Sequence, residues 1–116
     1  MNVNVEKSGN VIVVEVNETQ IGADAADEFR SCVQSALPAE GGQLMIGLSQ
    51  VDFMDSSGLG VLVSLLKAVR PGGDLVLYGL RPSVSEILSL THLDAVFTCE
   101  DTKEAALARF SADASA

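Results

Sequence analysis

Apolar and polar residues alternate over the first residues of the chain. Val3 and Val5 fall on one face of residues 2–7, and residues 8–10, Ser-Gly-Asn, have the chemistry of a tight turn. A run of mostly β-branched residues follows at 11–16, Val-Ile-Val-Val-Glu-Val. Two such segments joined by a short turn that contains glycine predict a β-hairpin.

After residue 23 the spacing of apolar residues changes to that of a helix. Between residues 26 and 37 they recur every three or four positions, as on one face of an amphipathic helix. These residues are Ala26, Phe29, Val33 and Leu37, and Pro38 ends the pattern. We expect Asp24 to cap the N-terminus of this helix, with Asp27 at the capping-box position.

The remaining chain alternates predicted strands and helices. The predicted strands are Leu44–Leu48, Leu75–Tyr78 and Ala95–Thr98, and the predicted helices cover 59–69, start at Pro82 and open at Asp101–Glu104. We expect residues 111–116 to form a frayed tail. The order of elements predicts an α/β fold in one domain spanning residues 1–116, with a single mixed sheet and right-handed crossovers.

The predicted helix 59–69 is apolar around most of its circumference. Leu62, Leu66 and Val69 have the spacing of a core face, whereas Val61 and Leu65 fall on another side. Two interpretations remain open at this point. Val61 and Leu65 form an outward strip that docks a partner, or another helix of the same domain covers them.

The composition excludes several classes of protein. The chain has 116 residues, 47% of them hydrophobic, and a mean hydropathy of +0.31, which indicates a globular protein. A net charge of −9 argues against binding to nucleic acid or to anionic membranes. No apolar run reaches the ~18 residues of a membrane span, and no signal peptide is recognisable. We therefore expect a cytoplasmic protein.

Metal and cofactor chemistry is not indicated. Cys32 and Cys99 lack the spacing of a metal or redox pair, and two such cysteines usually behave as small apolar residues. His92 is the single histidine and has no clustered cysteines or carboxylates in the sequence. We expect no bound metal, no cofactor and no enzymatic activity.

The most informative segment lies between the strand at 44–48 and the helix at 59–69. Residues 51–60 place Ser56 and Ser57 at the start of a helix, where unpaired backbone N–H groups and the helix dipole favour an anion. We expect a phosphate there to receive hydrogen bonds from these amides. The alternative is that one of the serines only caps the helix. Gly58 and Gly60 each cost roughly 1 kcal/mol relative to alanine, which suggests close approach to this backbone.

Known catalytic and nucleotide-binding motifs do not fit this segment. The nucleophile elbow G-x-S-x-G needs a glycine two positions before the serine, where Met54 and Asp55 stand. The phosphate-binding motif G-x-x-x-x-G-K-[ST] fails as well, because no lysine follows before Lys67. A hydrolase that pairs Ser56 or Ser57 with His92 lacks an evident carboxylate to orient the imidazole.

Residues 53–61, Phe-Met-Asp-Ser-Ser-Gly-Leu-Gly-Val, resemble the signature of the STAS domain, and more narrowly that of bacterial anti-sigma factor antagonists of the SpoIIAA and RsbV type. The likeness extends to the N-terminal hairpin, the helix 24–37, the Pro-Gly-Gly turn at 71–73 and residues 87–94. It implies a mixed sheet of four or five strands, with about four helices packed largely on one side.

The resemblance also implies a phosphorylation switch at Ser56, the hydroxyl residue directly after Asp55. The partner implied is a serine kinase that is also the anti-sigma factor, related to histidine-kinase-like ATPases, and a PP2C-type phosphatase would reverse the reaction. The free protein is expected to be a monomer. The residues assigned to partner binding are Asp55, Ser57, Gly58, Leu59, Gly60, Val61 and Asp24.

The sequence departs from the family pattern at one position. Gly22 stands where the family usually carries an aspartate near the phosphoserine loop, and Asp24 or Glu18 is a candidate replacement. The family also leaves an alternative function open. In that alternative the chain is a non-catalytic STAS subunit or regulator in another pathway, such as biofilm or secretion control linked to two-component systems, a stressosome or a lipid-transport complex.

Overall fold

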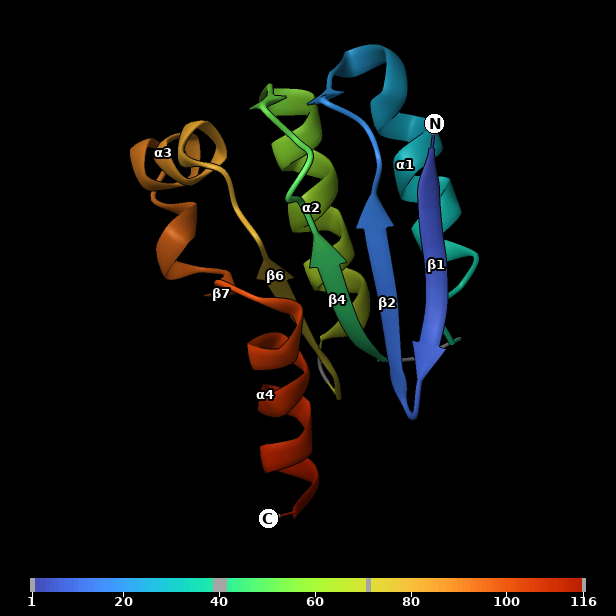
Figure 1. Cartoon of the computed structure of the whole chain (residues 1–116). Coiled ribbons are helices and arrows are strands. Elements are labelled where there is room, and N and C mark those ends of the chain that lie inside the picture. The colour runs from blue at the N-terminus through green and yellow to red at the C-terminus, as the bar shows by residue number, and fades with distance from the viewer. Residues whose placement is uncertain (1, 39–41, 71, 116) are drawn as a thin grey trace.

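The computed structural model describes residues 2–38, 42–70 and 72–115, and Figure 1 shows the arrangement of their helices and strands. In chain order the elements are β1 (Val3–Ser8), β2 (Val11–Val16), β3 (Gln20–Ile21), α1 (Ala23–Gln34), β4 (Gln43–Gly47), β5 (Phe53–Met54), α2 (Ser56–Val69), β6 (Asp74–Tyr78), α3 (Pro82–Leu90), a 3-10 turn η1 (Leu93–Ala95), β7 (Thr98–Glu100) and α4 (Lys103–Ser115).

Five strands form one mixed sheet in the order β1-β2-β4-β6-β7. β1 and β2 are antiparallel and form the predicted hairpin, whereas β2, β4, β6 and β7 pair in parallel. Helical crossovers connect the parallel strands, as parallel pairing requires. The predicted α/β class and mixed sheet are therefore confirmed.

The two faces of the sheet are covered unequally. One face packs against α1, α2 and α3 and carries the larger core, to which Ile12, Leu44 and Leu75 contribute. The other face packs against α4 alone, through a smaller cluster that joins Met45 and Val76 to Phe110. Figure 1 shows α1 and α2 behind the sheet and α4 in front of it. The helices thus lie largely on one side, as expected, and α4 is the exception.

The predicted outward strip on α2 is wrong. Val61 is 3% exposed and Leu65 is 0% exposed, and both belong to the larger core. The reason is that α1 packs against α2 and covers the side of α2 that does not face the sheet. The all-round apolar pattern of α2 therefore reflects burial between a sheet and a helix.

Several predicted boundaries also differ from the structure. The helix predicted over residues 24–37 ends at Gln34, and the helix predicted over 59–69 begins at Ser56. The last strand is Thr98–Glu100 and not Ala95–Thr98, because residues 93–95 form the 3-10 turn after His92, whose φ is +62°. The predicted frayed tail is helical through Ser115, and Ala116 lies outside the described residues. The helix predicted to open at Asp101–Glu104 begins at Lys103, and Thr102 caps it, because the Thr102 Oγ1 accepts a hydrogen bond of 3.1 Å from the N–H of Ala105.

Candidate functional site

A short parallel ladder aligns the N-termini of α1 and α2. β3 pairs with β5 so that Gln20 is opposite Phe53 and Ile21 is opposite Met54. The next residue in each segment is the N-cap of a helix, Gly22 for α1 and Asp55 for α2. The positive ends of two helix dipoles therefore lie side by side, and Ser56 is the first residue of α2.

Asp55, and not a serine, caps α2. Its Oδ1 accepts hydrogen bonds from the backbone N–H of Ser57 at 2.9 Å and of Gly58 at 3.2 Å. The prediction that one of the serines caps this helix is therefore wrong. Two of the first-turn amides expected to receive a phosphate are already bonded to this carboxylate, so the expected anion cradle is occupied by the protein itself.

The Ser56 side chain is exposed and is not used by the fold. Ser56 is exposed, whereas Ser57 is half-buried. In the part of the chain that the structure describes, the Ser56 hydroxyl forms no hydrogen bond with the protein. Since Asp55 caps the helix, the start of α2 does not need the Ser56 hydroxyl.

The glycine and apolar residues that follow divide into two groups. Gly58, Leu59 and Val61 are buried, whereas Gly60 is exposed. A Cβ atom at Gly58 would lie 2.5 Å from the Met54 Cγ and 2.9 Å from the Ile21 carbonyl oxygen, which real Cβ atoms do not tolerate. Gly58 therefore lets the first turn of α2 pack on β3 and β5, and the close approach inferred from the sequence is made by the protein's own backbone.

Asp24 lies near position 22 but does not cap α1. The N-cap of this helix is Gly22, which makes no side-chain cap hydrogen bond. A Cβ atom at Gly22 would lie 3.4 Å from the Asp24 Oδ1 and 3.5 Å from the Asp55 Oδ2. The carboxylates of Asp24 and Asp55 thus flank position 22. Of the two acidic residues considered as replacements for a carboxylate at position 22, Asp24 is the one that the structure brings to this point.

Gly22→Asp is expected to destabilise the protein at neutral pH, because it adds a third carboxylate between two others. The backbone of Gly22 is extended, with φ −113°, and accepts any residue. The repulsion at about 4 Å amounts to on the order of 1 kcal/mol. The matched control is Gly22→Asn, which has the same shape without the charge.

Thermal melts of both variants at pH 7 test this expectation. Gly22→Asp should melt below Gly22→Asn. Equal melting temperatures at pH 7 would contradict the proximity of the two carboxylates to position 22.

Phe53 is a feature of this region to which the sequence analysis assigned no role. The side chain is 53% exposed on β5, directly before Met54. The preceding loop is held by α3, since Arg81 donates to the Ser49 carbonyl at 2.7 Å and forms an ion pair with Asp52 at 3.4 Å. In the sequence, the signal that could have pointed to Phe53 is an aromatic residue that directly follows the charged Asp52 in a loop.

The other residues considered for chemistry do not assemble into a site. His92 is exposed, and in the described residues its imidazole forms no hydrogen bond and no ion pair, so the geometry of a Ser-His hydrolase is absent there. Both cysteines are free, and burial, with help from Asp94 and Glu100, raises the pKa of the Cys99 thiol. Within the same described ranges, no group of three or more His, Cys, Asp or Glu could hold a metal ion.

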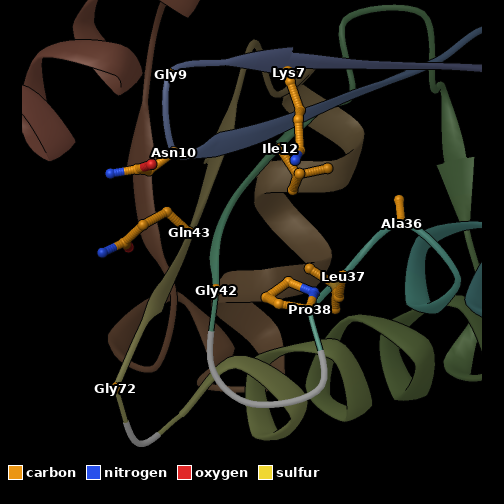
Figure 2. Close-up of a pocket in the computed structure, with 10 residues that line it drawn as sticks. All are labelled: Lys7, Gly9, Asn10, Ile12, Ala36, Leu37, Pro38, Gly42, Gln43 and Gly72. Carbon is orange, nitrogen blue, oxygen red and sulfur yellow. The ribbon is translucent and has the colours of Figure 1, made fainter.

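A cleft of about 410 Å³ lies at the opposite end of the sheet from Ser56. Figure 2 shows its lining, which comes from the β1–β2 turn, the segment after α1 and the start of β4. Lys7 is the only charged side chain among the ten lining residues, and the polar groups Asn10 and Gln43 accompany apolar Leu37 and Pro38. This lining has no grouping of acid, base or nucleophile that would indicate chemistry.

The geometry defines a class of protein: a small α/β domain that presents an exposed serine at the aligned N-termini of two helices. The model of the STAS domain family matches residues 2–106, and the chain belongs to this family. No helix in the described residues is long and apolar enough to cross a membrane.

Three relatives that are named anti-sigma factor antagonists illustrate the similarity. The chain is 35% identical over 95 residues to the anti-sigma-B factor antagonist of Bacillus subtilis, which covers 80% of this chain and 86% of that protein. The crystal structure of an anti-sigma factor antagonist from Mycobacterium paratuberculosis matches with a TM-score of 0.82 and 25% identity, over 93% of this chain and 92% of that one. The anti-sigma factor antagonist SpoIIAA in its unphosphorylated form has the same fold, with a TM-score of 0.77 at 18% identity over 96% and 97% of the two chains.

Proposed function

We propose that this protein is an anti-sigma factor antagonist that is switched by phosphorylation of Ser56 and has no catalytic activity of its own. The observation that carries the proposal is the Ser56 hydroxyl, which is exposed and unbonded at the start of α2 while Asp55 caps the helix. The names of the curated relatives support the same role. Such a role places the protein in the bacterial cytoplasm.

In the proposed cycle, the unmodified protein binds a serine kinase that is also an anti-sigma factor, and thereby releases the sigma factor. The kinase transfers the γ-phosphoryl group of ATP to Ser56 Oγ, the hydroxyl proton passes to a base of the kinase, and ADP leaves. A PP2C-type phosphatase hydrolyses the phosphoserine with water and restores the hydroxyl. ATP and metal ions belong to these partner enzymes.

Phosphorylation acts on the interface and not on the fold. The phosphoryl group adds about −1.5 to −2 charge units at neutral pH. It is added next to Asp55, whose carboxylate already accepts hydrogen bonds from two first-turn amides. The helix dipole stabilises this added negative charge by only ~0.3–1 kcal/mol, or up to ~2 kcal/mol in partly buried geometries. An unpaired charge buried at an interface costs ~2–5 kcal/mol, so the complex dissociates while the exposed side chain leaves the fold intact.

The alternative role is a structural STAS subunit that docks through an apolar outer face of α2. The residues expected to form that face are not accessible. Val61 and Leu65, the residues that would have formed that face, are buried under α1. The Ser56 loop is the remaining candidate for partner contact in this part of the structure.

We expect the phosphate on Ser56 and not on Ser57, because Ser57 is half-buried and its N–H is bonded to Asp55. The test is intact mass and fragment mapping after incubation with ATP and the serine kinase from the same organism. Ser56→Ala should abolish incorporation, and Ser57→Ala should retain it. Modification that persists in Ser56→Ala would contradict the assignment.

A further inference from the structure

The loop that leads into β5, residues 48–52, is attached to the rest of the domain on two sides. On one side, the Thr19 carbonyl oxygen accepts hydrogen bonds from the N–H of Asp52 at 2.7 Å and of Phe53 at 3.2 Å. On the other side, the loop bonds to the start of α3. Because β5 runs directly into the first turn of α2, the position of Ser56 depends on how this loop is held.

Two side chains at the N-terminus of α3 make the second attachment. The Nε of Arg81, the N-cap residue of α3, donates a hydrogen bond of 2.7 Å to the Ser49 carbonyl oxygen, and the Arg81 Nη1 lies 3.4 Å from the Asp52 Oδ1. The Ser83 hydroxyl donates to the Asp52 carbonyl oxygen. A guanidinium presents several donors in one rigid plane, so Arg81 fixes the loop at two points with a single side chain.

The Arg81 side chain is expected to add little to the stability of the fold. The side chains of Arg81 and Asp52 are 51% and 61% exposed, and ion pairs with this exposure contribute little to the free energy of unfolding. The bonds of Arg81 instead restrict where the loop and β5 can lie. An arginine with this combination of contacts is suited to positioning the residues that follow.

We infer that Arg81 is a positioning residue for the phosphorylation of Ser56: it fixes the loop before β5, and thereby holds the Ser56 hydroxyl in place for phosphoryl transfer. This inference rests on the proposed function, because the reaction is that of the serine kinase that modifies Ser56. Phosphoryl transfer depends on positioning, since the attacking and leaving oxygens lie roughly in line in the transition state. Arg81 acts through β5 and does not touch the reacting atoms.

The experiment measures the steady-state phosphorylation of wild type, Arg81→Ala and Arg81→Lys by the purified serine kinase from the same organism. In Arg81→Ala, kcat should fall by about tenfold or more, because the hydroxyl is no longer held, while KM should change by less than about threefold. Arg81→Lys keeps the charge opposite Asp52 but lacks the rigid fork of donors, so it should recover part of the lost rate.

A second measurement does not involve the kinase. Amide hydrogen exchange of the free protein reports how firmly β5 is held, because local opening exposes its N–H groups to solvent. The informative amides are those of Phe53 and Asp55, which bond to the carbonyl oxygens of Thr19 and Ile21. Both amides should exchange faster in Arg81→Ala than in the wild type.

Arg70→Ala is the matched control. The Arg70 side chain is 48% exposed and pairs with Asp74 at 3.1 Å, at the opposite end of α2 from Ser56. This variant should have the kcat, the KM and the β5 exchange rates of the wild type. Arg70→Ala and Arg81→Ala should both melt within about 5 °C of the wild type, as the loss of an exposed ion pair predicts.

The outcomes distinguish the inference from the proposed function. A wild-type kcat in Arg81→Ala, or a rise in KM alone, would overturn the inference and leave the switch at Ser56 intact. A lower kcat with unchanged exchange at β5 would mean that Arg81 acts on the kinase directly, which also overturns it. If Arg81→Ala unfolds at the assay temperature, Arg81 is a structural residue and the inference is wrong. If the kinase does not phosphorylate the wild type, the proposed function fails, and the inference fails with it.

Discussion

Val61→Glu is expected to destabilise this protein strongly. Val61 is 3% exposed in the core between the sheet, α1 and α2, and no basic side chain is among the buried residues described there. An uncompensated charge in such a place costs about 3–5 kcal/mol, against a total stability of about 5–15 kcal/mol for a typical domain. Urea unfolding followed by circular dichroism measures the loss.

The matched control for this variant is Ala68→Glu, which introduces the same residue at an exposed position of the same helix. It should unfold within about 0.5 kcal/mol of the wild type, as surface substitutions usually do. If Val61→Glu were as stable as Ala68→Glu, Val61 would not be a core residue. That result would support the hypothesis that an apolar strip on α2 binds a partner.

Ser56→Asp is expected to reduce kinase binding strongly while leaving the fold almost unchanged. The full phosphoserine charge should cost roughly 30-fold to a few thousand-fold in affinity, which corresponds to ~2–5 kcal/mol. Aspartate has less charge and lacks the three phosphate oxygens, so we expect part of this effect. Stability is preserved because Ser56 is exposed and Asp55 supplies the cap.

Ser56→Asn separates charge from shape in this prediction. Asparagine has nearly the size of aspartate without its charge, so it should bind the kinase more tightly than Ser56→Asp does. Titration calorimetry against the kinase, with thermal melts of each variant, gives both quantities. Equal affinities of the two variants would contradict a charge switch, and a large drop in the melting temperature of Ser56→Asp would contradict the capping role of Asp55.

The sequence alone identified the family and the order of the longer strands and helices, but not the two-residue strands β3 and β5, which it predicted as loops. The hairpin, the strands at residues 44–48 and 75–78, and the helix that starts at Pro82 follow from local periodicity, turn residues and proline, which act within a few residues. The block at residues 53–61 identified the STAS domain for the same reason, because the whole motif is contiguous. Local signals of this kind do not depend on which distant elements meet.

The tertiary structure decided which surface each of these residues faces. Periodicity showed that α2 is apolar all round, but only the packing of α1 on α2 shows that Val61 and Leu65 are core residues. The sequence analysis considered only the two serines as caps of α2, whereas the observed hydrogen bonds show that Asp55 is the cap. Gly58 and Gly60 look alike in the sequence. The structure distinguishes them, because Ile21, far away in the sequence, packs against Gly58 and not against Gly60. Burial and contact are properties of pairs of distant segments, and no local pattern of residues contains them.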